Sequence, residues 1–346
     1  MKTHFLAGLG KSLAITAAIA LGTAGFASAK TLKVQTSQNA GDFTFEYMTK
    51  RWAPVLATMS GGELQIELLP TKSVVPHRET PDAVGIGILD GDLTATAYFS
   101  GRDPVFAIMG DLIAGYDTPD QMQTFCMNGG GKEVLQQAYD KISGKIHVIG
   151  CGPYSREALV AKKPIRGVDD LNGVKIRSPE GLASEVFKRA GASPVALPFS
   201  EVYTSLEKGI VDAADASAYA NNTASGMHKI AKFPIYPGIH SMAMIQFTLN
   251  KDLWNSLSDA HKAMLDTWYL AAYTDLRRHA DLNDRDIVAK DNAGGDITVV
   301  DWTQEERDKF RAIAEGAWKD FSDKSELAKI AYDAHIAFMK RTGLLK

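Results

Sequence analysis

The chain has few cysteines, and no apolar run in it is long enough to cross a membrane. Its 346 residues include only two cysteines, Cys126 and Cys151. An oxidising compartment would allow these two to pair, but the sequence leaves open whether they lie within the ~7 Å that a disulfide requires. The longest early apolar run, Leu13 to Leu21, falls short of the ~20 residues that span a bilayer.

The chain also lacks an excess of basic residues. It holds 38 lysines and arginines against 41 acidic residues, a formal net charge of −3. Proteins that bind nucleic acids need a basic face or stripe, because neutralising phosphates supplies most of their non-specific affinity. No such stripe is present, so the composition argues against a nucleic-acid partner.

Motifs for metal or nucleophile chemistry are missing as well. None of the eight histidines forms an HExxH set or combines with cysteines at zinc-ligand spacing. There is no GxSxG elbow, and the glycine-rich stretch 128–132 follows a helical pattern instead of the strand that a phosphate loop needs. The sequence predicts neither an enzyme nor a bound cofactor.

The first 29 residues have the order of a secretory signal peptide. Lys2 and Lys11 precede the apolar run, and small residues follow it and end at Ala27-Ser28-Ala29. A charged start, a short apolar stretch and small residues before a cleavage site are typical of export. We therefore expect a mature protein in the periplasm that is not itself embedded in the membrane.

The remaining residues predict an α/β fold with two lobes. Short β-branched runs alternate with helical patterns, which is typical of α/β units with mainly parallel sheets. The chain exceeds what one core usually serves. We predict a first lobe from residues 30–152 plus 242–275 and a second from 153–241 plus 276–346. Residues 251–290 contain no proline or glycine and predict one long helix that spans both lobes.

One run stands out as a candidate anion site. The segment PIRGVDDLNGVKIR, Pro164 to Arg177, is followed by Ser178-Pro179-Glu180-Gly181 and then by a helical pattern. This order places Arg177 at the end of a strand, where α/β proteins bind ligands. A guanidinium can donate two parallel hydrogen bonds to a carboxylate. The alternative for Arg177 is an ordinary surface salt bridge.

The same run resembles a known family. Together with GASPVALPFSEVYTSLEKGIVDAAD (191–215) and TAYFSGRDPVFAIM (96–109), it is similar to the DctP family, the solute receptors of TRAP transporters. The resemblance covers nearly the whole mature chain. It implies a two-lobed, class II-like periplasmic binding protein that closes on a small organic-acid anion and delivers it to a sodium-coupled membrane permease. It further implies that Arg177 clamps the carboxylate and that Arg156 faces the same cleft.

Within that family the chain looks most like the branch that binds 2-oxo acids. In that branch a glutamine, an acidic residue followed by tryptophan, and a glutamate hold a cation, and the matching positions here are Arg156, Asp215-Ala216 and Ser241. Only the carboxylate of Asp215 is retained. Because an oxygen-bound cation usually needs several carboxylates, and Arg156 could replace the cation electrostatically, we predict no metal.

Further cleft residues follow from the resemblance and from the segment FPIYPGIH (233–240). The alternative for each aromatic residue among them is core packing, and for His240 a structural hydrogen bond to Asp215. Two other functions use the same residues: a receptor for a signalling system, and a carboxylate-processing enzyme with Asp215 or His240 as its base. The further candidates for lining the cleft are Tyr98, Phe99, Tyr219, Asn221 and His240.

Overall fold

The computed structural model describes residues 29–239 and 241–345. The predicted signal peptide, apart from its last residue, and His240 lie outside this part of the chain. No helix in the described part has the length and apolar character needed to cross a membrane.

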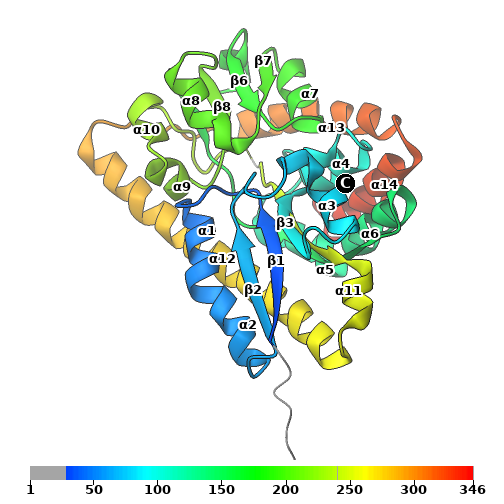
Figure 1. Cartoon of the computed structure of the whole chain (residues 1–346). Helices are drawn as coiled ribbons and strands as arrows, with labels where there is room; N and C mark the ends of the chain where they lie inside the picture. Colours follow the sequence, from blue (N-terminus) through cyan, green and yellow to red (C-terminus); the bar gives the residue numbers. More distant parts are fainter. Residues whose placement is uncertain (1–28, 240, 346) are drawn as a thin grey trace, which may run out of the picture.

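The larger lobe is built on a five-stranded sheet in the order β2-β1-β3-β9-β4 (Figure 1). Strand β1 pairs in parallel with β2 and β3, whereas β9 runs antiparallel to both β3 and β4. Strand β9, the last of the five in the sequence, thus lies inside the sheet between β3 and β4. The strands are β1 (Lys30–Thr36), β2 (Leu64–Leu69), β3 (Gly91–Ala95), β4 (Ile146–Pro153) and β9 (Met244–Asn250).

The smaller lobe contains a four-stranded sheet in the order β5-β8-β6-β7. Strand β6 is parallel to β7 and β8, and β5 is antiparallel to β8. The sheets are therefore mixed, and the predicted mainly parallel pairing is corrected by the return strands β5 and β9. The strands are β5 (Leu159–Ala161), β6 (Lys175–Ser178), β7 (Ser193–Ala196) and β8 (Ala213–Asp215).

Helices cover both sheets (Figure 1). Around the larger sheet lie α1 (Phe43–Tyr47), α2 (Ala53–Met59), α3 (Thr80–Gly85), α4 (Val105–Gly110), α5 (Pro119–Asn128), α6 (Gly131–Ile142) and α11 (Lys251–Ser256). Around the smaller sheet lie α7 (Leu182–Arg189), α8 (Val202–Glu207), α9 (Tyr219–Ala224) and α10 (Met227–Ile230). Helix α13 (Gln304–Ser322) packs on α7, and α14 (Glu326–Arg341) returns to α4 and α6.

Apolar residues at spacings of three and four predict one helix over residues 42–59. In the structure this helix contains a π-helical turn, η1 (Met48–Trp52), between α1 and α2. Pro54 lies at the start of α2. Because proline has no backbone N–H to donate, an interior helical hydrogen bond is lost at that position. The wider turn just before Pro54 accommodates this loss, and the chain continues as a helix.

The long helix is confirmed, but it begins later than the sequence predicted. Helix α11 ends at Ser256, and α12 spans Asp259–Gly294, 36 residues. The Ser258 hydroxyl accepts a hydrogen bond from the His261 backbone N–H, so it caps a new helix where one continuous helix was expected. At 1.5 Å per residue α12 is about 54 Å long. It packs against β4 of the larger lobe and against α9 of the smaller one (Figure 1).

Two local features matter for the site. Cys126 of α5 and Cys151 of β4 form a disulfide, with 5.8 Å between their Cα atoms, which resolves the open question about their pairing. The sequence pattern predicts a strand over residues 93–99, but β3 ends at Ala95, its last residue that pairs with β9. Without a partner strand the chain turns into a 3-10 helix, η3 (Thr96–Phe99).

Candidate functional site

A cavity of about 30 Å³ lies between the two lobes, with Arg177 on its wall. Arg177 lies on β6, with β7 and β8 on either side, and its side chain is buried. Its Nε donates to the Leu197 carbonyl at 2.8 Å and its Nη1 to the Asp215 carbonyl at 2.5 Å. Both partners are backbone groups, so the guanidinium is held in place without a carboxylate bound to it and can receive one from a ligand.

Three buried carboxylates lie together beside this arginine. Oxygens of Asp111, Glu157 and Asp215 all lie within 4.8 Å of one another. The Ser241 hydroxyl lies 2.8 Å from Asp111 Oδ2, 3.1 Å from Glu157 Oε2 and 3.0 Å from Asp215 Oδ2. A hydroxyl has one proton to donate, so it can satisfy only one of the three groups. Asp215 Oδ1 has no hydrogen-bond partner within the described residues.

Burial and mutual repulsion raise the pKa of each acid. Burial raises the pKa of Asp111 to about 8, and the charge of Asp215 adds to the effect. Burial and the charges of Asp215 and Asp111 raise the pKa of Glu157 well above its usual value. Burial raises the pKa of Asp215 to about 6, against the lowering effects of Arg177 and the Ser241 hydrogen bond. Such a cluster retains protons or holds a cation.

The structure removes the argument on which the prediction of no metal was based. That prediction counted Asp215 as the one carboxylate retained, whereas Asp111 and Glu157 supply two more at the same point. Three carboxylates and a hydroxyl form a donor set that suits an oxygen-liganded cation. The sequence offered no signal for Asp111, which follows the apolar helix α4, or for Glu157, which is adjacent to the residue that the resemblance selected.

Glycine at position 110 brings two walls of the cavity together. A Cβ on Gly110 would lie 2.5 Å from the backbone nitrogen of Ala97, so a larger residue would force α4 away from η3. This close approach places Tyr98 and Asp111 on the same cavity. The structure places Tyr98 on the wall of this cavity, on the 3-10 helix η3. Its hydroxyl accepts a hydrogen bond from the Phe199 N–H of the smaller lobe at 3.0 Å.

Three other predicted lining residues, Phe99, Tyr219 and Asn221, lie elsewhere. Phe99 is fully buried and packs edge-on against Phe106, so its side chain is part of the core. Tyr219 is also buried, and its hydroxyl donates to Asp291 at 2.7 Å. Asn221 accepts from the Phe43 N–H at 3.0 Å and so joins the two lobes. Neither Tyr219 nor Asn221 lines the cavity of Arg177.

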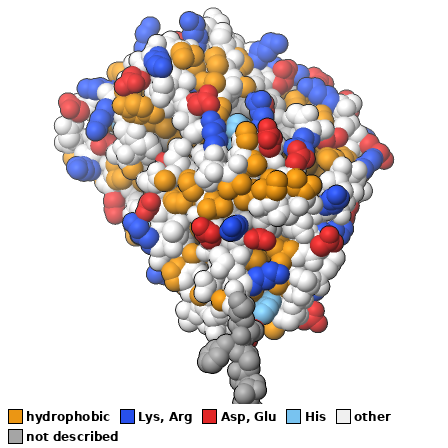
Figure 2. Space-filling model, in the orientation of Figure 1, with side chains coloured by type: hydrophobic (Ala, Val, Ile, Leu, Met, Phe, Trp, Pro, Cys, Tyr) orange, Lys and Arg blue, Asp and Glu red, His pale blue; other side chains and the backbone are white. Residues whose placement is uncertain are grey.

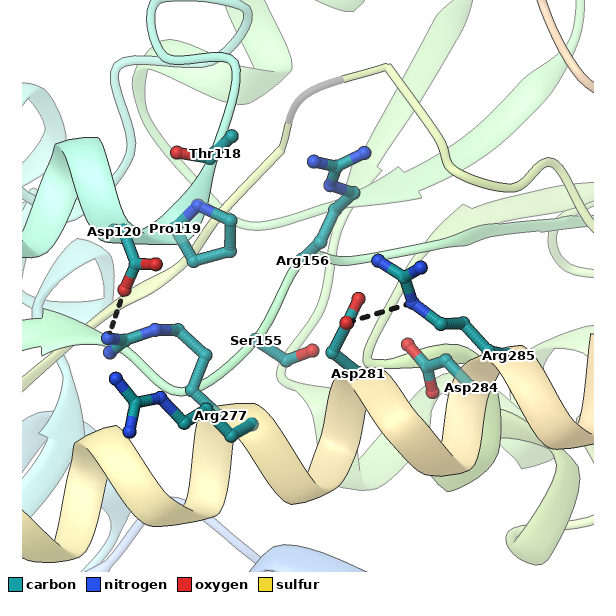
Figure 3. Close-up of a pocket in the computed structure, with 10 residues that line it drawn as sticks. Thr118, Pro119, Asp120, Ser155, Arg156, Arg277, Asp281, Asp284 and Arg285 are labelled. Carbon is teal, nitrogen blue, oxygen red and sulfur yellow. Dashed lines mark hydrogen bonds and ion pairs between the residues drawn. The ribbon is translucent and has the colours of Figure 1, made fainter.

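Arg156 lines a different and larger pocket, of about 220 Å³, beside α12 (Figure 3). Its Nη2 donates to the Asp117 carbonyl at 2.9 Å, and burial lowers the pKa of the Arg156 guanidinium. The two arginines expected in one cleft are therefore in separate cavities. Glu157 takes the position facing Arg177. The pocket of Arg156 is lined by Thr118, Pro119, Asp120, Ser155, Arg156, Arg277, Arg278, Asp281, Asp284 and Arg285.

Ion pairs join the lobes near the cavity. Arg78 donates to Glu180 through Nε at 3.1 Å and through Nη2 at 2.8 Å. Lys72 Nζ lies 3.0 Å from Glu201 Oε1. The lysine and the arginine belong to the larger lobe and the glutamates to the smaller one, so the structure shows the lobes closed on each other.

In the view of Figure 2, apolar side chains form a band across the middle of the molecule.

Comparisons with known proteins agree with this architecture. The family model described as bacterial extracellular solute-binding protein, family 7 (DctP), matches residues 35–325. A monocarboxylate 2-oxoacid-binding periplasmic protein of Nostoc is 27% identical over 290 residues, covering 83% of this chain and 78% of the relative.

Two solved structures have the same fold. A TRAP periplasmic solute-binding protein of Rhodobacter sphaeroides, in an apo open form, is 40% identical with a TM-score of 0.76, covering 91% of this chain and 99% of that one. A TRAP solute-binding protein of Colwellia psychrerythraea with bound calcium and pyruvate is 21% identical with a TM-score of 0.79, covering 91% and 96%. The family and its structural relatives are solute-binding receptors and not enzymes, as the sequence predicted. This chain belongs to the DctP family of bacterial extracellular solute-binding proteins.

Proposed function

We propose that this protein is a periplasmic receptor of a TRAP transporter, which binds a small organic-acid anion between its lobes and delivers it to sodium-coupled permease subunits. The observation that carries the proposal is the buried guanidinium of Arg177, which is held by two backbone carbonyls and faces the interlobe cavity. The Nostoc relative is named for 2-oxo acids, and the Colwellia structure holds pyruvate. Both support a small carboxylate as the ligand.

Binding couples to closure of the lobes. We propose that residues 30–152 plus 242–275 form one moving body and 153–241 plus 276–346 the other. Residues from both line the cavity, among them Tyr98 and Asp111 on one side and Arg177 and Phe199 on the other. A ligand that contacts both sides binds the closed form more tightly than the open one, and it shifts the population toward closure.

The acid cluster sets a condition on anion binding. A carboxylate ligand at Arg177 would approach Asp111, Glu157 and Asp215. Four buried negative charges against one arginine are unfavourable in a medium of low dielectric constant. The cluster must therefore be neutralised when the anion binds, either by a cation held by the carboxylates and Ser241 or by protons.

Calorimetric titration of the mature protein with a library of mono- and dicarboxylic acids tests the proposal. We expect at least one small carboxylate to bind, and Arg177→Ala to abolish its binding. Failure of the whole library, or an Arg177→Ala protein that binds as well as the wild type, would overturn the assignment. A melting-temperature screen adds sensitivity, since a ligand at about 100 times its Kd stabilises by ~2.7 kcal/mol.

The same titration distinguishes a cation from protons. The chelator-treated protein is titrated with the acid alone, with calcium and with sodium, in buffers of different ionisation enthalpy. Affinity that rises with one of the ions indicates that the acid cluster holds it. An affinity that neither ion changes, together with proton uptake on binding, indicates protonated carboxylates and supports the prediction of no metal.

A further inference from the structure

A second, smaller cavity lies directly behind the cavity of Arg177. Its volume is about 20 Å³, which is room for about one water molecule. It lies between the end of β1, helix α1 and helix α12, on the side of the larger lobe (Figure 1). Ser37, Gln38 and Ile245 line both cavities and so form the wall between them.

Of these three residues, Gln38 is the one whose polar side chain makes no hydrogen bond to a described residue. The Ser37 hydroxyl accepts a hydrogen bond from the Ala95 N–H at 3.3 Å, and Ile245 belongs to β9 in the middle of the sheet. The Gln38 side-chain amide makes no hydrogen bond to any residue that the structure describes, and its Oε1 is buried. Gln38 can therefore turn without breaking a hydrogen bond to a described residue, and it stands where the two cavities meet.

The rear cavity contains two further polar groups without partners. Thr44 is buried, and its Oγ1 has no hydrogen-bond partner within the described chain. Tyr273 also borders the cavity, and its hydroxyl makes no hydrogen bond to a described residue. Buried polar groups nearly always have a partner, because leaving one unpaired costs about 1–3 kcal/mol. The two buried unpaired oxygens, Gln38 Oε1 and Thr44 Oγ1, indicate a polar ligand atom at this cavity.

The remaining walls are uncharged and largely apolar. Thr36, Phe45, Met48, Leu68 and Leu93 complete the lining among the described residues, which include no lysine, arginine or histidine at this cavity. A carboxylate placed here would be buried without a counter-charge, which is strongly unfavourable. A neutral oxygen avoids that cost and can still hydrogen-bond to Thr44, Tyr273 and Gln38.

We propose that the rear cavity is a second ligand subsite, which receives the far end of a monocarboxylic acid whose chain ends in a neutral hydrogen-bonding oxygen. This inference rests on the proposed function, in which Arg177 binds the carboxylate. The ligand extends past Gln38, with its apolar carbons against Met48 and Leu93. Dicarboxylates are selected against, in contrast to the dianion that two arginines in one cleft would suit.

Three acids of equal chain length test the subsite. δ-Hydroxyvalerate, valerate and glutarate end in a hydroxyl, a methyl and a carboxylate, and each is titrated into the wild-type protein by calorimetry. We expect δ-hydroxyvalerate to bind about fivefold more tightly than valerate, as one net hydrogen bond provides, and glutarate to bind most weakly. Equal affinities, preference for glutarate, or no binding of these acids overturns the subsite. If the proposed function itself is wrong, the whole acid library fails, including short acids such as lactate.

Two isosteric variants locate the effect. Thr44→Val and Tyr273→Phe each remove one hydroxyl, and we expect each to reduce the preference for δ-hydroxyvalerate over valerate while the affinity for valerate changes less than about twofold. Thr49→Val is the matched control, because the Thr49 hydroxyl is also buried without a described partner but does not border the cavity. An unchanged preference in both test variants, or the same loss in the control, contradicts the proposal.

Discussion

The pocket of Arg156 beside α12 and the interlobe cavity of Arg177 differ in volume and in the partners of their arginines. The pocket beside α12 is several times larger than the interlobe cavity. Two of its four arginines are in ion pairs, Arg277 with Asp120 and Arg285 with Asp281. Among the described residues, Arg177 of the small cavity is buried and donates only to two backbone carbonyls, and its charge acts on the nearby carboxylates of Glu157 and Asp215. The comparison teaches that the burial and the neighbours of an arginine distinguish these pockets better than their volumes do.

The largest expected effect separates the two pockets directly. Arg177→Lys retains the charge but loses the planar fork, and we expect it to weaken acid binding by about tenfold to a hundredfold, since hydrogen bonds to charged groups contribute about 1.5–3 kcal/mol each. Arg156→Lys is the matched change in the α12 pocket and should alter affinity by less than about threefold. Calorimetry on both proteins provides the measurement. Equal losses would place both arginines on the ligand and break the comparison.

Removal of the disulfide should affect stability without affecting the interlobe cavity. Cys126–Cys151 ties α5, whose start borders the α12 pocket, to β4. A bridge that closes a loop of this length contributes about 3 kcal/mol in the chain-entropy account. We expect the Cys126→Ala/Cys151→Ala protein to lose about that much in denaturant unfolding. Its affinity for the acid should stay within twofold of wild type, and a larger change would couple the two regions.

A smaller effect is expected at the contact between the lobes. Arg78 and Glu180 are partly exposed, so their pairing contributes at most about 1 kcal/mol. Arg78→Glu should speed ligand dissociation about threefold to fivefold. The charge-swapped protein with both Arg78→Glu and Glu180→Arg should recover most of the loss. Stopped-flow dissociation at low and high salt measures both, and a swap as fast as the single variant would show that the pair does not hold the lobes closed.

The smallest effect concerns the pH dependence of stability in the α12 pocket. Burial raises the pKa of Asp284 to about 7, while the Ala220 and Tyr219 N–H groups and Arg156 oppose the rise. The native state therefore keeps a proton between about pH 4 and 7 that the unfolded chain releases, so this group's stabilising contribution is lost as the pH rises through that window. Asp284→Asn should flatten this slope in unfolding experiments. Asp281→Asn, at an exposed position, should reduce it less, because the charge of Asp281 is only a minor contribution to the raised pKa of Asp284.

Much of the fold follows from local patterns. The long helix, the strand that carries Arg177 and the two-lobed organisation depend on spacing and composition along the chain, which the sequence displays directly. Errors arose where non-local contacts intervened. Strand β3 ends at Ala95 because its pairing with β9 stops at Ile245, next to the first residue of β9, and Ser258 caps a new helix after α11.

The candidate site was only half predictable for the same reason. Arg177, Asp215 and Tyr98 belong to motifs that the resemblance covers, and they line or border the interlobe cavity. Asp111 and Glu157 have no motif of their own, and Phe99, Tyr219 and Asn221 pack or bridge outside that cavity. Which of two adjacent residues, Arg156 or Glu157, faces the ligand depends on how the extended segment is oriented between the lobes.

The sequence by itself determined the class of this protein: an α/β receptor of the DctP family with an arginine at the end of a strand. These properties depend on colinear motifs and on short-range periodicity, which the sequence shows directly. Only the tertiary structure decided the chemistry around that arginine, including the separation of Arg156 from Arg177 and the meeting of three carboxylates at Ser241. The physical reason is that charge compensation and burial depend on distances through space, between residues that lie as far apart in the chain as Asp111 and Ser241.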